Sequence, residues 1–279
     1  MYRNVWKNCH QSVCQINFYS KSGIKLLSMT GFKANDNFLI TDEYFFKSIK
    51  KASEVEIKFL KADGFTTDAV KRVSVKEIEN RILKELGTRD VAFAAINIDF
   101  KEFEKIPSLK LGINKNVEIG QSVAILGFQL DKSNLCVKSG IISSAFINES
   151  GLKYIQVDSS IKQGNSGSPL INTETCEVVG IIGHKLATIT QSHKRMKQII
   201  NNNLAILKKS QGLFNVEEID PIQVLIANQN QIKHITNEIY KTATMSIGYA
   251  LDISYVHDLF EEFIDAEVSP TSLKFQIDA

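Results

Sequence analysis

A succession of short apolar segments, separated by turn residues, runs from about Ser12 to Leu186 and limits the folds open to this chain. In segments such as 55–59 (VEIKF) polar and apolar residues alternate, which is the period of a strand with one buried face. No helical period interrupts the series, and so many strands at this spacing favour a sandwich or a barrel. The sequence therefore predicts a mainly β fold of antiparallel strands.

The spacing of apolar residues changes to a helical period beyond Ala187. Asp220 and Pro221 form an N-cap and first-turn pair, so the sequence predicts two amphipathic helices, the second of which opens at this pair. Their apolar stripes are expected to pack on each other or on the strands; the alternative is that the helices bind a partner or regulate the protein. A strand over 248–253, a helix opening at Ser254 and a loose tail should follow.

Charge and composition exclude several kinds of partner. The 279 residues carry 33 basic and 31 acidic side chains, and no window is dominated by lysine or arginine, so no nucleic acid or membrane partner is expected. The N-terminus lacks the apolar region of a secretory signal, and no stretch reaches the roughly 18 apolar residues of a membrane span. The sequence thus predicts a cytoplasmic protein.

The four cysteines are sparse for this length and are expected to be reduced thiols. Cys9 and His10 with Cys14 could form half of a metal site, but no second pair of ligands follows at finger-like spacing. The sequence favours the other interpretation, in which these are small buried side chains. No metal and no cofactor are assigned.

The segment best suited to chemistry is the loop of residues 164–170 (GNSGSPL). Glycines on both sides of Ser166 permit a tight turn that exposes its hydroxyl group. Such a turn can aim the backbone N–H groups of Gly164 and Ser166 at one point, where they would bind a developing oxyanion. An apolar segment on each side of the loop distinguishes it from an ordinary Gly/Ser turn.

Residues 164–170 resemble the nucleophile loop of the trypsin-like serine peptidases, in the HtrA-like, bacterial-type branch. The resemblance extends to the segments 30–32 with 37–41, 88–92, 111–112 with 119–127, and 247–251. It implies a peptidase domain of residues 1–266, made of two antiparallel six-stranded β-barrels with a helical insertion and a C-terminal helix. The expected boundaries are about 12–110 for the first barrel, 111–186 plus 246–266 for the second, 187–245 for the insertion and 267–279 for the C-terminal tail.

By the same resemblance, Ser166 is the nucleophile, Asp90 is the carboxylate that orients the base, and Gly164 with Ser166 forms the oxyanion hole. The chain order of base, acid and nucleophile is respected. The base position, however, holds Tyr44 in place of the family's histidine. A phenol stays protonated at neutral pH and cannot accept from a serine while donating to a carboxylate, so the exchange predicts a severe loss of catalysis.

The resemblance also places Ser160, His184 and Lys185 in the pocket for the substrate side chain. Ser160 precedes the nucleophile by six positions, where trypsin itself carries an aspartate, so cleavage after arginine or lysine is not supported. His184 and Lys185 indicate a polar or acidic substrate side chain instead.

Three functions are consistent with these residues, and each has a peptide or protein as its substrate or ligand. The first is a serine endopeptidase that is degenerate or inactive because of Tyr44. The second is a pseudoprotease or scaffold that binds a peptide or protein through the cleft or the helical insertion. The third is an active protease in which the substrate, a partner or an unusual local arrangement supplies the base.

Overall fold

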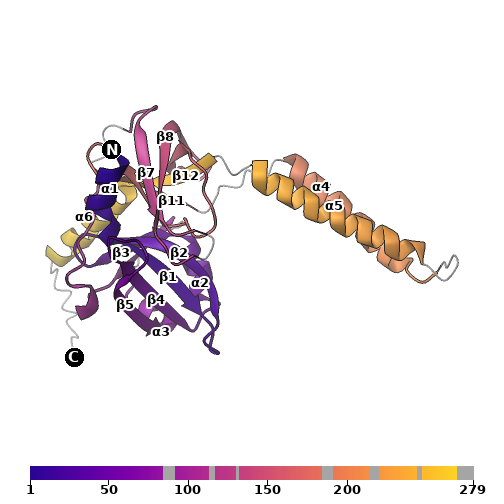
Figure 1. Cartoon of the computed structure of the whole chain (residues 1–279), viewed down its shortest axis with the longest axis horizontal. Coiled ribbons are helices and arrows are strands. Elements are labelled where there is room, and N and C mark those ends of the chain that lie inside the picture. The colour runs from indigo at the N-terminus through magenta and orange to yellow at the C-terminus, as the bar shows by residue number, and fades with distance from the viewer. Residues whose placement is uncertain are drawn as a thin grey trace, which may run out of the picture. The chain divides into compact units, whose positions relative to one another are not determined.

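The computed structural model describes residues 1–83, 92–112, 117–129, 132–183, 191–213, 220–243 and 247–268. The chain divides into two compact units. One unit joins Met1–His184 with Gly248–Ala279 and contains the β-sheets, and the other is Lys185–Ile247 and contains two long helices (Figure 1).

The first six strands form one antiparallel sheet in the order β5-β4-β1-β2-β3-β6. The strands are β1 (Val13–Tyr19), β2 (Lys25–Ala34), β3 (Phe38–Asp42), β4 (Glu54–Leu60), β5 (Thr67–Ser74) and β6 (Phe93–Asn97). Asn35 and Asp36 turn the chain from β2 to β3 with φ of 43° and 60°, the left-handed conformation that asparagine and aspartate tolerate best after glycine. After β5, residues 81–83 pair with β6 along its other edge.

The last six strands form a closed antiparallel barrel in the order β10-β11-β12-β9-β8-β7. The strands are β7 (Ser122–Gly127), β8 (Cys136–Ile147), β9 (Lys153–Asp158), β10 (Pro169–Asn172), β11 (Val178–Ile182) and β12 (Ile247–Asp252). The helices lie between β11 and β12 in sequence, yet these two strands pair directly. The predicted mainly β fold is confirmed. Of the two six-stranded antiparallel barrels that the sequence predicts, the second is a closed barrel and the first is a six-stranded sheet.

Short helices accompany the strands of this unit. They are α1 (Tyr2–Cys9), α2 (Tyr44–Ile49), α3 (Val75–Glu79), α6 (Ser254–Val268) and the 3₁₀ turns His10–Ser12 and Lys101–Phe103. Ser74 caps α3, because its hydroxyl accepts from the backbone N–H of Glu77 at 3.2 Å. The helix α6 packs by Val256, Leu259 and Phe260, which belong to the largest apolar cluster.

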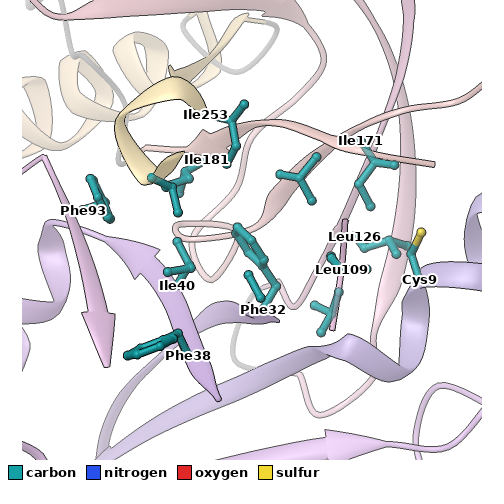
Figure 2. Packing of buried hydrophobic residues seen from close by; sticks show 14 of the residues in the cluster. Cys9, Phe32, Phe38, Ile40, Phe93, Leu109, Leu126, Ile171, Ile181 and Ile253 are labelled. Carbon is teal, nitrogen blue, oxygen red and sulfur yellow. The ribbon is translucent and has the colours of Figure 1, made fainter. Parts of the chain in front are cut away.

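That cluster joins the sheet to the barrel. Phe32 and Ile40 come from the sheet, while Leu126 and Ile181 come from the barrel, and Figure 2 shows these side chains pointing toward one another. Separate clusters fill the first sheet and the interior of the barrel. Because the border between the two assemblies is apolar and buried, it fixes loops from both of them against each other.

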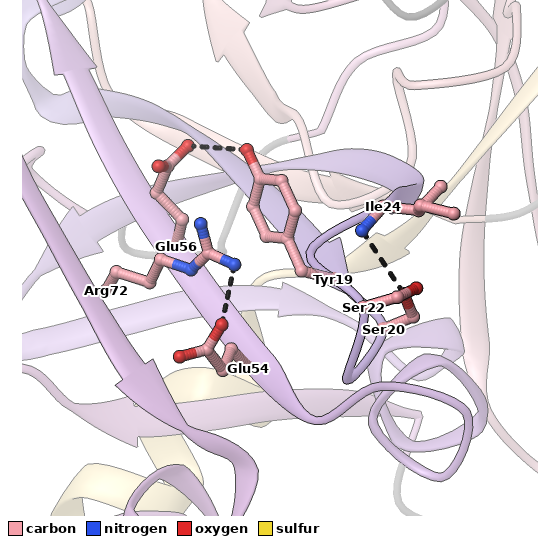
Figure 3. Close-up of polar contacts among 7 residues, drawn as sticks. All are labelled: Tyr19, Ser20, Ser22, Ile24, Glu54, Glu56 and Arg72. Carbon is pink, nitrogen blue, oxygen red and sulfur yellow. Dashed lines mark hydrogen bonds and ion pairs between the residues drawn. The ribbon is translucent and has the colours of Figure 1, made fainter.

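A polar cluster braces the outer part of the first sheet (Figure 3). The guanidinium group of Arg72 binds Glu54 at 2.6 Å and lies 4.0 Å from the centre of the Tyr19 ring. The Tyr19 hydroxyl donates to Glu56 at 3.2 Å. Burial, followed by the nearby charge of Glu56, raises the pKa of Tyr19. These contacts join β1, β4 and β5 side by side.

The second unit is a hairpin of two helices, α4 (Gln191–Lys209) and α5 (Pro221–Ala243). Ile200 and Leu204 of α4 are buried, and the Lys233 ammonium group of α5 donates to the Asn201 side chain at 2.9 Å. Asp220 accepts from the backbone N–H of Ile222 at 2.8 Å, as expected of the residue that opens α5. Among the residues described, no helix is long and apolar enough to cross a membrane.

Candidate active site

Ser166 lies in the loop between β9 and β10, flanked by two glycines in left-handed conformation. Gly164 has φ of +95° and Gly167 has φ of +82°. A Cβ atom at Gly164 would meet the Phe128 carbonyl oxygen at 2.9 Å, and one at Gly167 would clash with the Thr30 carbonyl oxygen and the Thr41 hydroxyl. Only glycine fits at either position, because both the backbone conformation and the close packing exclude a side chain.

Thr30 of β2 connects the loop to the first sheet. Its backbone N–H donates to the Ser166 carbonyl at 2.9 Å, and its hydroxyl donates to the Gly164 carbonyl at 2.7 Å. The same hydroxyl accepts from the Phe128 N–H at 3.0 Å, and the Thr30 carbonyl accepts from the Thr41 hydroxyl at 2.8 Å. One fully buried residue thus holds the backbone on both sides of Asn165, by its hydroxyl at Gly164 and by its backbone N–H at Ser166.

Asn165 and Lys138 hold the loop from the barrel side. The Asn165 side chain is buried; its amide nitrogen donates to the Phe128 carbonyl at 2.7 Å, and its oxygen accepts from the Lys162 N–H at 3.0 Å. The ammonium group of Lys138, on β8, donates to the same Asn165 oxygen at 2.9 Å and also to the Ser160 carbonyl. Burial, followed by the nearby Lys162, lowers the pKa of Lys138.

The backbone N–H groups of the serine loop differ in whether they donate a hydrogen bond within the protein. The N–H groups of Asn165, Gly167 and Ser168 donate to carbonyl oxygens of Lys162, Ile182 and Asn165 at 2.8–3.0 Å. The N–H of Gly164 donates to no acceptor among the residues described. An N–H left over in an otherwise bonded loop is a donor available to an oxygen of a ligand.

Tyr44 is the first residue of α2, and Glu43 alone separates it from the end of β3. Its backbone N–H donates to the buried Asp42 carboxylate at 3.1 Å, and its side chain is half-buried. Phe45 and Ile49, on the inner side of α2, pack in the core of the first sheet. Since Thr41 of β3 touches the serine loop, β3 leads the chain from that loop to Tyr44.

Of the other predicted site residues, the structure describes only Ser160. Ser160 is half-buried, and the Lys138 bond to its carbonyl places it beside Asn165. Asp90, His184 and Lys185 lie outside the described residues. Sequence reasoning missed Thr30 and Lys138 as supports of the loop; the available signal was a threonine and a lysine within otherwise apolar or small-residue strand segments.

Of the four cysteine thiols, two are buried and two are partly exposed. Cys9 and Cys14 are buried free thiols, and burial raises the pKa of Cys9 to about 12. The His10 ring stacks on Trp6 with centroids 5.5 Å apart and donates to the Trp6 carbonyl at 2.6 Å. Within the described part of the chain, no group of three or more histidine, cysteine, aspartate or glutamate side chains could hold a metal ion.

A six-stranded sheet and a six-stranded barrel with a glycine-flanked serine loop between them match the trypsin-like fold, and sequence comparison gives the family. A family model described as a trypsin-like peptidase domain matches residues 30–181, more than half of the chain. The chain belongs to the trypsin-like peptidase family.

Individual relatives are HtrA-type proteins. The chain is 29% identical over 170 residues to Serine protease HTRA1A of Danio rerio, an alignment that covers 58% of this chain and 31% of the relative. It is 36% identical over 110 residues to a "Probable periplasmic serine endoprotease DegP-like" of Pseudomonas fulva, covering 38% of this chain and 21% of the relative. The aligned regions thus span a third or less of these relatives, and the predicted HtrA-like resemblance is confirmed.

A solved structure has the same fold. The structure titled "HtrA-type protease AlgWS227A with tripeptide" aligns with a TM-score of 0.57 over 96% of this chain and 64% of that chain, at 14% sequence identity. This similarity supports the trypsin-like fold.

Proposed function

We propose that this chain is a trypsin-like serine endopeptidase with severely impaired hydrolysis that keeps the ability to bind a peptide. The observation that carries the proposal is a contrast between two neighbouring parts of the candidate site. The Ser166 loop is braced by Thr30, Asn165 and Lys138, whereas Tyr44 stands where the sequence resemblance leads us to expect the family's histidine.

The chemistry of the exchange explains the impairment. A serine hydroxyl needs a neighbour that removes its proton and then protonates the leaving amine, and imidazole does both because it titrates near neutral pH. A phenol at neutral pH does neither. In another serine protease, loss of the histidine costs roughly 10⁶ in kcat and leaves roughly 10³ to 10⁴ over water, from the oxyanion hole and binding. We expect a loss of that order here.

The surviving part of the site supports binding. The available N–H belongs to Gly164, two residues before Ser166. A hydrogen bond from this N–H would polarise the carbonyl of a bound peptide. The HtrA-type structure that shares this fold is described with a tripeptide, which supports a peptide as the ligand class here. Asp90 as the orienting carboxylate, and Ser160, His184 and Lys185 as a pocket for a polar or acidic side chain, remain part of the proposal.

The test compares the wild-type chain with Ser166→Ala. The wild type should turn over casein and fluorogenic peptides at rates close to those of Ser166→Ala. A peptide aldehyde, which can add to a serine oxygen, should bind the wild type more tightly than it binds Ser166→Ala. Hydrolysis by the wild type at ordinary protease rates, lost in Ser166→Ala, would overturn the impairment and favour a protease with an unusual base.

A fluorophosphonate probe tests the nucleophile separately. We expect labelling of Ser166 to be slow and to leave the Ser166→Ala variant unlabelled. Rapid labelling at neutral pH would contradict the proposal, because it requires a base that already activates the hydroxyl.

The cytoplasmic location also stays a prediction, since the DegP-like relatives are named as periplasmic.

A further inference from the structure

The hairpin of α4 and α5 exposes large apolar side chains that its own packing does not use. Its inner side is formed by Ile200 and Leu204 of α4, which are buried against α5. Outside this contact, eight apolar side chains of the two helices are between 44% and 65% exposed. One is Val224, and the other seven are Met196, Ile199, Ile206, Leu225, Ile232, Ile235 and Ile239.

The seven side chains other than Val224 follow a heptad spacing in both helices. With one asparagine in each helix they form two stripes in which successive members lie three or four residues apart. The stripes, together called the apolar face, are Met196, Ile199, Asn203 and Ile206 on α4 and Leu225, Asn228, Ile232, Ile235 and Ile239 on α5. Stripes with this spacing are typical of helices that pack side by side at a shallow angle.

Both stripes lie on the same side of the hairpin. Ile199 directly precedes the inner residue Ile200 in α4, and Leu225 precedes the partly buried Ile226 in α5. One residue corresponds to a rotation of about 100° around an α-helix, in the same sense for both helices. The two helices run antiparallel in the hairpin (Figure 1), so equal rotations bring both stripes to one side.

The apolar face carries no charged side chain. Lys197, Lys208 and Lys209 of α4 fall at other positions around the helix, and Arg195 borders the face. Two such faces can therefore meet without bringing like charges together. A partner chosen by charge would find no complementary group to bind there.

We propose that the hairpin pairs through the apolar face with the same face of a second copy of this chain, forming a four-helix bundle. A face two helices wide is covered completely by another face of equal width, and two antiparallel hairpins give the up-and-down bundle that this spacing suits. Asn203 and Asn228 favour a copy over an unrelated apolar partner. An amide donates and accepts, so an asparagine can pair with an asparagine of the copy.

The area supports a stable association. The seven apolar side chains, each about half exposed, offer on the order of 700 Å² per copy, close to the roughly 800 Å² per partner of a standard interface. Exposed apolar patches of this size on a single chain are unusual unless they bind something. The proposed self-association does not depend on whether Ser166 and Tyr44 support catalysis.

The test measures the mass of the full chain by light scattering after size-exclusion chromatography over a wide range of concentrations. The disrupting variant is Ile206→Glu with Ile232→Glu, which places charges in the apolar face. The matched control is Ala205→Glu with Ala227→Glu, which adds the same charges at exposed positions on another side of each helix. Circular dichroism checks that both variants keep their helical content.

We expect a dimer for the wild type and the control, and dissociation of the disrupting variant at concentrations at least about 100-fold higher than for the wild type. A wild type that is monomeric at every concentration would overturn the proposal, as would a dimer unaffected by Ile206→Glu with Ile232→Glu. Binding of the monomeric chain to anionic vesicles, lost only in the disrupting variant, would assign the face to a membrane surface instead.

Discussion

At the residue scale, the serine loop depends on polar side chains that are themselves buried. Thr30 satisfies two groups of opposite kind, the Gly164 carbonyl and the Phe128 N–H, with one hydroxyl. Removing that hydroxyl while keeping the shape of the side chain leaves a donor and an acceptor unpaired at a fully buried position.

Thr30→Val is therefore expected to lower the free energy of unfolding by about 2 kcal/mol or more. Thr30→Ser keeps the hydroxyl and should lose less, since only a methyl group is removed. Urea denaturation of the three proteins measures the difference. Equal stability of Thr30→Val and the wild type would mean that the Thr30 hydroxyl does not hold the loop.

Lys138 introduces a pH dependence of known sign. Its pKa is lowered from 10.5 in the folded chain, chiefly by burial, so the unfolded chain binds this proton more tightly. Stability then rises with pH as the pH increases through the lowered pKa toward 10.5. The Lys138→Met variant lacks this contribution.

The unfolding free energies of the wild type and Lys138→Met, compared at about pH 7 and about pH 10, test that sign. We expect the wild type to gain stability relative to the variant at the higher pH. A relative loss would show that the ammonium form is favoured by its bonds to Asn165 and Ser160 more strongly than it is disfavoured by burial.

At the scale of elements, the junction of β3 and α2 determines where Tyr44 lies. Phe45 and Ile49 anchor the short helix in the core of the first sheet, and Asp42 holds its first N–H. The Tyr44 side chain itself is only half-buried. A substitution there should therefore change the chemistry of the site more than the stability of the fold.

The hairpin helices permit a prediction about their asparagines. In the proposed bundle Asn203 and Asn228 are buried at a cost in stability, in exchange for a defined register. Asn203→Leu should strengthen self-association by about tenfold and broaden the distribution of oligomers. Light scattering reads out both effects, and weaker association of Asn203→Leu would contradict the proposed pairing.

At the scale of the whole molecule, the helical unit occupies the connection of a β-hairpin. Ile182 of β11 pairs with Ala250 of β12, and the Gly183 N–H donates to the Tyr249 carbonyl at 3.0 Å. The ends of the helical unit therefore leave the barrel from paired strands, and a short turn can replace the unit without opening the barrel.

Replacing residues 185–246 with a short glycine-containing turn should leave a folded protein. We expect cooperative thermal unfolding with a melting temperature near that of the full chain, and a monomer in light scattering. A replacement that unfolds would show that the helices stabilise the barrel; one that still forms dimers would place the self-association elsewhere.

The sequence predicted the β class from the local alternation of polar and apolar residues. It predicted the tight serine turn from the glycines on both sides of Ser166. It could not predict α2, which has only six residues, or β5, which is polar and mostly exposed. Both are stabilised by tertiary partners and not by a local pattern of apolar residues. Thr30 and Lys138 contact residues more than 20 positions away in sequence, so their roles become visible only once the sheet and the barrel are packed.

We expect Tyr44 to limit catalysis in an otherwise supported serine site. The most direct measurement is kcat/KM of Tyr44→His for a peptide substrate, beside Tyr44→Phe and the double variant Tyr44→His with Ser166→Ala. We predict a gain of at least about 10³ for Tyr44→His that rises with pH through about 6.5, where an imidazole loses its proton. Tyr44→Phe and the double variant should show no gain. A folded Tyr44→His protein with the activity of the wild type would contradict the account.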